Sequence, residues 1–566
     1  MNVGVQPSGC FAETGGPNSA CPSHVNDSGP QPAPTGATLI SRGREPTEYP
    51  VDFAQAPEGR HPARHCVAPS GPGGDGPVTP RAFAHSDTVP PLSEPRLIQH
   101  SKQPEGWTPT AKSLAFIVAL LFAAPLPAAE YHVGPDQPIK RLEMAPFARL
   151  EAGDLLAIHW RPEPYRVKWV LACRGTKEKP ITVRGIPGPE GQLPVIEADG
   201  AITGTGLNFW SGQRALIKIG GSNTPPDVVP AHIVIEGLDL GGARPGRNFF
   251  GRDGLQEYSD MASAVFIEKG EHITIRSCRI HDCANGFFTA SEAREILVEG
   301  CHIENNGVEG SGYQHNSYTE ASGITFQFNR FGPLRDGCPG TNLKDRSAGA
   351  VVRYNLIEGG NRQLDFVESQ EGDTIKTDPR YHQAFVYGNV LIERANDGNP
   401  QIVHFGGDSG PEPDFRQGPL WFYNNTVISK RRNNTTLLRL STQLQSAEVF
   451  NNIVYVEAEG PRLSILDETG TVRLHHNWLK KGYKECHGDL KGSISDSGNL
   501  TGDNPGFRDA PAADFRLAET SPALHAGIAL PKALEEHPVK YELVPPFGFR
   551  KRTAADKPDL GAFQSP

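Results

Sequence analysis

The sequence is poor in methionine, in hydrophobic residues and in clustered positive charge. Among its 566 residues only 3 are Met and 37% are hydrophobic, a low share for one core of that size. The formal net charge is −10 and no basic block occurs, which argues against a nucleic-acid partner. No two cysteines have the C-x-x-C spacing of a zinc site. These absences disfavour a single ordinary globule, a nucleic-acid binder and a structural zinc protein.

The chain also lacks an apolar run long enough to favour a membrane-spanning helix. Its main apolar run, Leu114 to Ala124, follows Lys112 and is followed by a proline break and small residues up to Ala129. This order is typical of a secretory signal peptide, which we place at residues 113–129; a membrane anchor and a buried helix are the alternatives. We expect a product that begins shortly before Lys112, is secreted or periplasmic in a bacterium, and keeps no stable membrane insertion after cleavage.

Residues 1–112 form a leader that is rich in Pro, Gly and Ser and has no hydrophobic periodicity. Such a segment buries too little apolar surface to offset the entropy of ordering, so we predict that the leader is disordered. Cys10, Cys21 and Cys66 lie in it, which leaves six of the nine cysteines for the rest of the chain. Those six fit an exported protein with a few disulfides, and they fit buried thiols of a β core equally well.

What the sequence does contain is turn-forming residues at regular intervals. The chain has 62 Gly and 51 Pro, and Asn recurs in its second half. Nine segments can be aligned, each with a short apolar–polar alternation, a Gly or Asn turn and a second short apolar run. Their intervals are roughly 23 to 40 residues, in the range of a solenoid. The residues aligned at the turn are Leu238, Cys278, Cys301, Asn329, Asn355, Asn389, Asn425, Asn452 and Asn477.

Stacked coils are the structure that this repeat predicts. One coil cannot bury its apolar face alone, so successive coils must stack their strands into parallel sheets. Asparagine suits the turn because it tolerates left-handed backbone and its amide can bond to the next coil. Leucine-rich repeats, the main alternative array, would show a leucine consensus with helical segments, which this sequence lacks.

These repeats resemble the right-handed parallel β-helix superfamily of pectate-lyase-like proteins, over roughly residues 130–500. Residues 131–160 resemble the segment with which that superfamily begins, which implies a short helix capping the open solenoid. The stretch from "NPGFRD" to "DLGAFQSP" is similar to the terminal segment of secreted bacterial members. We therefore expect an all-β, single-stranded, right-handed parallel β-helix with an Asn ladder. Residues 501–566 should form an irregular C-terminal tail that packs on it.

A second set of strands, between the ladder turns, brings charged residues into one column. Strand side chains alternate between the two faces, so an inward Leu343, Leu364, Val403 and Leu438 leave their neighbours pointing outward. Those neighbours would be about 4.8 Å apart from coil to coil. The predicted column is Tyr318, Lys344, Asp365, His404 and Arg439, with His315, Arg346 and Glu368 at its margins.

The column suits β-elimination of a uronic-acid polysaccharide. That reaction needs a cation for the carboxylate, a base for the C5 proton and an acid for the leaving oxygen. We predict Lys344 as base, Arg346 or Arg439 as carboxylate clamp, and Tyr318 or His404 as acid, with Asp365 orienting Lys344 or His404. His315, Arg439, Glu368 and Asp408 are predicted to contact the acidic polysaccharide.

The strand "NLKDR" is similar to the one that carries the catalytic lysine of the alginate lyase and chondroitinase B family, which maps onto Lys344. One coil later, where that family has a catalytic arginine, this sequence has Phe366 or Val367. No counterpart of the family's acidic calcium site is evident, so calcium stays open as a cofactor. The resemblance implies a divergent relative.

Two other functions fit parts of the same pattern. A polygalacturonase-type hydrolase would use Asp365, Glu368 and Asp408 as its carboxylates. A non-catalytic β-helix would bind glycans or form a surface structure, and each charge would then belong to an ordinary solvated face. The acidic, Pro- and Gly-rich stretch 406–419 is predicted to be a plain surface loop rather than a wall of the site.

Overall fold

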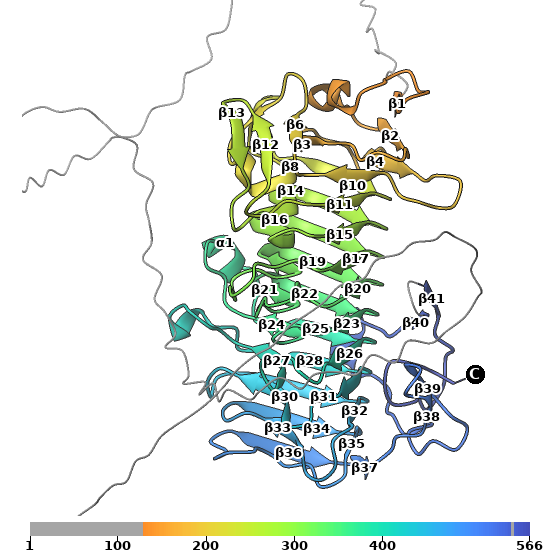
Figure 1. Cartoon of the computed structure of the whole chain (residues 1–566). Helices are drawn as coiled ribbons and strands as arrows, with labels where there is room; N and C mark the ends of the chain where they lie inside the picture. The colour runs from red at the N-terminus through yellow and green to blue at the C-terminus, as the bar shows by residue number, and fades with distance from the viewer. Residues whose placement is uncertain (1–127, 545–547, 566) are drawn as a thin grey trace, which may run out of the picture. The chain divides into compact units, whose positions relative to one another are not determined.

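The computed structural model describes residues 128–544 and 548–565, which all fall within one structural unit. The predicted leader and nearly all of the signal-like segment lie outside the described residues. Within the described ranges, no helix is both long and apolar enough to cross a membrane. The unit is a stack of coils that begins at β1 and ends at β37 (Figure 1).

The coils stack into three parallel faces, called sheets here, of which the first two are continuous with each other through the long strands β14 and β16. The first, called here the site sheet, contains β3 (Val167–Leu171), β8 (Ala215–Ile219), the first half of β14 (Ser263–Arg276), the first half of β16 (Asn285–Glu299), β18 (Ser317–Thr319), β21 (Leu343–Asp345), β24 (Leu364–Phe366), β27 (Gln401–Phe405), β30 (Thr435–Leu440) and β33 (Leu463–Leu466).

The second sheet follows the site sheet in each coil. It contains β1 (Glu130–Val133), β2 (Leu155–His159), β4 (Ile181–Ile186), β10 (Ala231–Glu236), the second halves of β14 and β16, β19 (Ala321–Gln327), β22 (Ala348–Arg353), β25 (Ala384–Tyr387), β28 (Leu420–Tyr423), β31 (Ser446–Phe450), β34 (Thr471–His475) and β36 (Ser493–Ser497).

The third sheet closes the coil after the asparagine turn. It contains β5 (Val195–Glu197), β11 (Asp239–Gly241), β15 (Arg279–His281), β17 (His302–Glu304), β20 (Arg330–Phe331), β23 (Leu356–Glu358), β26 (Val390–Glu393), β29 (Thr426–Ser429), β32 (Ile453–Val456), β35 (Trp478–Lys480) and β37 (Leu500–Gly502). Inward Val, Ile, Leu and Phe side chains from all three sheets form one continuous core along the stack. The predicted all-β parallel β-helix is confirmed.

The asparagine ladder joins the second and third sheets. The Asn355 amide nitrogen donates to Asn389 Oδ1 at 3.0 Å, and the Asn389 amide donates to Asn425 Oδ1 at 3.0 Å. Each ladder oxygen also accepts the backbone N–H of the asparagine in the preceding coil, as Asn389 does from Asn355 at 2.9 Å. The ladder runs one rung beyond the predicted one, because Asn477 donates to Asn499 at 2.9 Å. The ladder therefore gives hydrogen-bond partners both to the buried side-chain amides and to the backbone groups of the turn.

One detail of the predicted ladder is wrong. The left-handed residue is not the ladder asparagine but the residue before it, as at Tyr354 (φ 57°) and His476 (φ 52°). The asparagine is thus selected for its amide, which reaches both the coil interior and the next coil, rather than for its backbone. The left-handed position accepts Gly in some coils, such as Gly388 (φ 68°), and Asn in others.

The first end of the stack is covered, whereas the last strands, β36 and β37, are largely exposed. Instead of the predicted short helix, two 3₁₀ turns, η1 (Leu142–Met144) and η2 (Phe147–Arg149), close the first coils, and Phe147 stacks on Trp169 with ring centroids 4.9 Å apart. These turns are too short to form an α-helix because prolines and extended residues interrupt them. The only other helices in the described ranges are η3 (Gly212–Arg214), α1 (Asp373–Lys376), η4 (Glu412–Asp414) and η5 (Lys532–Leu534).

The C-terminal tail packs back along the coils. It carries the hairpins β38 (Phe507–Asp509) with β39 (Asp514–Leu517) and β40 (Tyr541–Val544) with β41 (Gly548–Lys551). Tyr423 donates its hydroxyl to the His537 carbonyl at 2.6 Å, and Phe328 stacks on Phe549. Further short strands lie on the early coils: β6 (Ala201–Thr203), β7 (Asn208–Phe209), β9 (Ser222–Thr224), β12 (Asn248–Gly251) and β13 (Gly254–Glu257).

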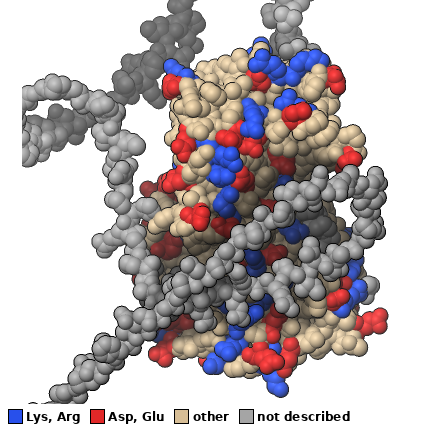
Figure 2. Space-filling view, in the orientation of Figure 1, with Lys and Arg blue, Asp and Glu red and all other residues tan. Residues whose placement is uncertain are grey.

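All six cysteines in the described residues are free thiols, four of them buried. Cys278 and Cys301 occupy consecutive rungs where later coils have asparagine, and Cys301 still takes part in the ladder, because its N–H donates to Asn329 Oδ1 at 2.9 Å. The surface in the view of Figure 2 carries both signs of charge interspersed, which agrees with the absence of a basic block.

Substitution of a ladder residue tests its contribution to stability. Asn389→Ala leaves buried backbone groups of two coils without a partner, so we expect it to lower the free energy of unfolding by about 1–3 kcal/mol. The matched control is Asn433→Ala, since Asn433 is exposed and outside the ladder. Urea unfolding followed by circular dichroism measures both. Equal stability of the two variants would contradict a contribution of the ladder to the free energy of unfolding.

Candidate active site

The five residues of the predicted column occupy matching positions on consecutive strands of the site sheet. Tyr318 pairs with Lys344, Lys344 with Asp365, Asp365 with His404, and His404 with Arg439. Their neighbours Leu343, Leu364, Val403 and Leu438 are fully buried in the core. The outward column is therefore present as predicted, and it places residues from five coils in one row.

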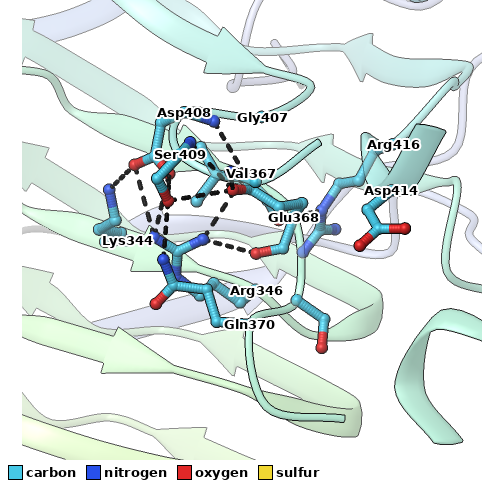
Figure 3. A network of polar contacts seen from close by, with 12 residues as sticks. Lys344, Arg346, Val367, Glu368, Gln370, Gly407, Asp408, Ser409, Asp414 and Arg416 are labelled. Atoms are coloured by element: carbon cyan, nitrogen blue, oxygen red, sulfur yellow. Dashed lines mark hydrogen bonds and ion pairs between the residues drawn. The ribbon is translucent and has the colours of Figure 1, made fainter. Parts of the chain in front are cut away.

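Lys344 lies between two carboxylates. Its Nζ is 3.1 Å from Asp365 Oδ2 and also contacts Asp408 Oδ2, and only 12% of its side chain is exposed (Figure 3). Burial disfavours the ammonium ion, but the two carboxylates outweigh burial and raise the pKa of Lys344 above its ordinary value. Lys344 is consequently a fixed positive charge.

Arg346 connects Tyr318 to Glu368 and Asp408 through hydrogen bonds of its guanidinium group. Its Nε donates to Tyr318 Oη at 3.0 Å, its Nη1 to the Glu368 carbonyl at 2.5 Å, and its Nη2 to Asp408 Oδ1 at 3.1 Å. Its side chain is only 3% exposed, yet the phenol and the carboxylates around it raise its pKa despite burial. The guanidinium thus holds Tyr318 and Asp408 in place from beneath.

Glu368 anchors the loop 406–419. Its carboxylate accepts the backbone N–H groups of Asp408 at 2.8 Å, Ser409 at 3.0 Å and Gly410. Those bonds aim the Asp408 side chain at Lys344 and Arg346 (Figure 3). The prediction of a plain surface loop is wrong for this part of it: residues 407–410 form a wall of the site. Glu368 is buried and positions this wall, so it is not available to contact a polymer as predicted.

Behind the wall, a buried ion pair ties the same loop to the strands. Arg416 Nη2 contacts Asp345 Oδ2 at 3.0 Å, and both side chains are fully buried. Arg416 Nε also donates to the Val367 carbonyl at 2.8 Å. Val367 stands where the resemblance implied an arginine. Its side chain is buried in the core, and its backbone carbonyl accepts a hydrogen bond from Arg416.

His404 is the centre of a relay that ends at Ser441. Its Nδ1 is 2.6 Å from Asp365 Oδ1 and its Nε2 is 2.9 Å from Ser441 Oγ. Burial lowers the pKa of His404 although Asp365 opposes this. Ser441 Oγ also lies 2.9 Å from the Gly407 N–H and 2.8 Å from the Gly407 carbonyl, so its hydroxyl is fully used in fixing the turn. The relay positions Asp365 and offers no free nucleophile.

His315 lies beside Tyr318 as a neutral ring. Its Nδ1 accepts the Thr341 N–H at 2.9 Å, so its proton is on Nε2. Burial, with Lys344 next in effect, lowers the pKa of His315 to about 3. The two rings meet edge to face with centroids 5.3 Å apart. Tyr318 Oη therefore has a cation on one side and a neutral imidazole nearby.

Two arginines lie at the far end of the row. Arg439 is four coils from Tyr318, about 19 Å at the coil spacing, so it cannot bind the same sugar as Tyr318. Arg362, which the sequence pattern missed, has a pKa lowered by burial, with Asp365 and Arg439 among its charged neighbours. Neither side chain makes a hydrogen bond to another described residue, and Arg362 Nε is buried without a partner. Arg362 lies in a turn before its strand, where side-chain alternation predicts nothing.

The residues present do not fit a calcium ion. Among the described residues, no group of three or more His, Cys, Asp or Glu side chains is arranged to hold a metal. The nearest carboxylates, Asp365 and Asp408, are already neutralised by Lys344 and Arg346. A divalent cation would have to displace those buried positive charges.

The family model for the right handed beta helix region matches residues 195–378, which span β5 to α1. The chain has the right-handed parallel β-helix fold. No curated protein sequence matches it closely enough to count as a relative.

Three solved structures to which the chain has a weak similarity are an alginate lyase, a lacto-N-biosidase and a pectate lyase. The alginate lyase, from Paenibacillus, is 12% identical, with 58% of this chain and 94% of that chain covered and a TM-score of 0.37. The lacto-N-biosidase, from Eubacterium ramulus, is 13% identical, with 66% and 68% covered and a TM-score of 0.41. The pectate lyase is 11% identical, with 78% and 97% covered and a TM-score of 0.40. Similarities of this size carry no argument about the function of this chain.

The ion pairs of Asp408 predict how stability depends on pH. Burial would raise the pKa of Asp408, but Lys344 and Arg346 hold it well below the ordinary value near 3.9. The carboxylate therefore stabilises the fold at neutral pH, and this contribution disappears as the pH falls below about 4. We expect Asp408→Asn to lower the unfolding free energy at about pH 7 and to have a shrinking effect toward about pH 3.

Urea unfolding at several pH values measures this effect, and Asp253→Asn serves as the control because Asp253 is exposed. A difference between wild type and Asp408→Asn that stays constant over the whole range would refute the ion-pair explanation.

Proposed function

We propose that the protein is a polysaccharide lyase that cleaves a uronic-acid-containing glycan by β-elimination at Tyr318. The observation that carries the proposal is the contact between Tyr318 Oη and the buried Arg346 guanidinium, one coil from the protonated Lys344. Negative charge that develops on the phenol oxygen is stabilised by Arg346. This pairing supplies a proton acceptor and donor beside a fixed cation.

In the proposed reaction, Tyr318 first gives its hydroxyl proton to solvent, and its oxygen, held by Arg346, then takes the C5 proton of the uronate. The electrons of that C–H bond form the C4=C5 double bond while the C4–O bond to the neighbouring sugar breaks. Tyr318 then gives its proton to the departing oxygen, which restores the phenolate. One residue thus performs both proton transfers, and no outside oxidant, reductant or water is consumed.

Lys344 has a different task from the predicted one. Asp365 and Asp408 raise its pKa, so it is poorly suited to remove a proton. We assign the N–H of Lys344 that remains after its contacts with Asp365 and Asp408 to bind the uronate carboxylate, together with the Nε2–H of the neutral His315. A neutralised carboxylate makes the adjacent C5 proton more acidic, because the charge of the enolate-like intermediate then has a partner. Asp365, His404 and Asp408 hold Lys344 in position.

Hydrolysis by paired carboxylates, the second candidate, has less support. A glycosidase needs one carboxylic acid that stays protonated near neutral pH. Asp365 and Asp408 have pKa values well below the ordinary range because of Lys344, and Glu368 is occupied by backbone N–H groups. None of the three carboxyl groups predicted for hydrolysis, Asp365, Glu368 and Asp408, is therefore poised as the acid.

The test is cleavage of a panel of uronic-acid polymers, followed by the ultraviolet absorbance of the conjugated unsaturated uronate. Tyr318→Phe removes only the hydroxyl, so we expect kcat to fall about 10²- to 10⁴-fold while the polymer still binds. Tyr541→Phe is the control, because Tyr541 belongs to the tail hairpin β40–β41. Thermal unfolding of both variants verifies that they fold.

Three outcomes would overturn the proposal. New reducing ends without the absorbance would indicate hydrolysis. Full activity of Tyr318→Phe would remove Tyr318 from the chemistry. Binding without any cleavage of the polymers, unchanged in Lys344→Ala, would favour a non-catalytic glycan-binding protein.

A further inference from the structure

An aromatic row continues the column on the side of Tyr318 opposite to Lys344. Tyr318 pairs with Phe288, Phe288 with Phe266, and Phe266 with Lys218 in the preceding coils. The ring centroids of Phe288 and Tyr318 are 5.1 Å apart, and those of Phe266 and Phe288 are 5.4 Å apart. The outward face of the site sheet therefore changes from charged to aromatic at Tyr318.

Arg214 lies over this row without a polar partner. Its guanidinium carbon is 4.9 Å from the Phe266 ring centroid and 4.8 Å from that of Phe288. Its side chain makes no hydrogen bond or ion pair with another described residue, and its Nε is buried without a partner. Burial lowers its pKa, and the nearest acidic groups act on it only at a distance. A planar cation with unused N–H donors is suited to receive a carboxylate in a bidentate manner.

The loop that carries Arg214 is fixed by two buried lysines. Lys168 Nζ donates to the Gly212 carbonyl at 2.5 Å, and Lys218 Nζ donates to the Trp210 carbonyl at 2.8 Å. Both amines have side chains that are fully buried. Burial lowers the pKa of both amines, and each amine fixes one backbone carbonyl of the loop by a hydrogen bond.

Trp210 is presented at the edge of the same loop. Its indole Nε1 donates to Glu268 Oε1 at 2.8 Å, and Glu268 in turn pairs with Lys218 at 2.7 Å. Its side chain nevertheless remains 40% exposed. An indole that is fixed at both its backbone and its nitrogen, yet exposed, offers a preorganised flat surface for stacking.

We propose that Arg214 and Trp210 form a glycan subsite that binds a second uronate residue of the polymer. Arg214 receives its carboxylate, and Trp210 packs against the apolar face of its pyranose ring. That the ligand is a uronic-acid polymer rests on the proposed function. Arg214 lies beside the rings one and two coils from Tyr318, about 5 to 10 Å along the stack, so the bound sugar is one or two residues from the cleaved bond.

Because of this placement, the affinity of the protein for an oligomer should depend on how many sugars the oligomer has on the Arg214 side of the cleaved bond. A polymer that lies along the column would meet Arg214 on one side of Tyr318 and the Arg362–Arg439 pair on the other. The reacting sugar would be held between two cationic positions. Short oligomers would reach only the central residues, whereas longer ones would also fill the Arg214 subsite.

The experiment measures Kd by calorimetry for a length series of uronic-acid oligomers, in the Tyr318→Phe background so that nothing is cleaved. Arg214→Met keeps the aliphatic packing over Phe266 and Phe288 and removes the donors. We expect it to weaken binding of the longer oligomers about tenfold, or about 1.4 kcal/mol, and to leave the shortest unchanged. The matched control is Arg252→Met, since Arg252 is an exposed arginine.

A second variant, Trp210→Ala, and thermal unfolding of all variants separate binding from misfolding. In the active protein, the same changes should raise KM for the polymer with little change in kcat, which a structural role would not produce. Equal affinity of Arg214→Met and Arg252→Met, or an equal loss at every length, would overturn the subsite. Because binding is measured without cleavage, absence of lyase activity would refute the proposed function alone.

Discussion

Parallel hydrogen bonding between successive coils is the constraint on which the site depends. It fixes the repeat at about 4.8 Å and forces equivalent residues of different coils into straight columns. The asparagine ladder holds this register, because each amide bonds to the coil beside it and to the turn of its own coil. Residues that are far apart in the sequence, such as Tyr318 and His404, become members of one row without any loop having to bring them together.

Charge balance determines what that row can do. Lys344 and Arg346 are nearly inaccessible to water, a state that is unfavourable for isolated charges. Asp365 and Asp408 compensate them, and Glu368 fixes the loop that supplies Asp408. The network therefore keeps both cations charged and leaves Tyr318, on the margin of the network, as the polar group best placed to exchange a proton. The aromatic row next to it supplies a surface suited to sugar rings.

The column was predictable from the sequence because it depends on side-chain alternation and on the turn asparagines. The inward side chains of Leu343, Leu364 and Val403 determine which neighbours face outward. Parallel pairing of successive coils then aligns those outward residues in one row. Residues outside that periodicity could not be placed in this way. The sequence predicts Asp408 as a contact of the polysaccharide or as a carboxylate of a hydrolase, whereas its contacts with Lys344 and Arg346 depend on the path of the loop 406–419.

Arg362, Arg214 and Ser441 illustrate the same limit. Arg362 and Arg214 lie in turns, and Ser441 follows the end of β30, so no strand alternation specifies their directions. The roles of Lys344 and Glu368 also required the structure, since their charge partners come from another coil or loop. Sequence patterns thus predict the scaffold and the row. The contacts that each residue of the row makes with the loops become known only from the structure.

The central claim, cleavage by elimination at Tyr318, is tested most directly by the mass of the products formed in water labelled with heavy oxygen. Elimination creates a new end that is lighter by one water and takes no oxygen from the solvent. We expect products of that mass without label, and none from Tyr318→Phe. Products that carry one solvent oxygen at the cleaved bond would contradict elimination and assign the site to hydrolysis.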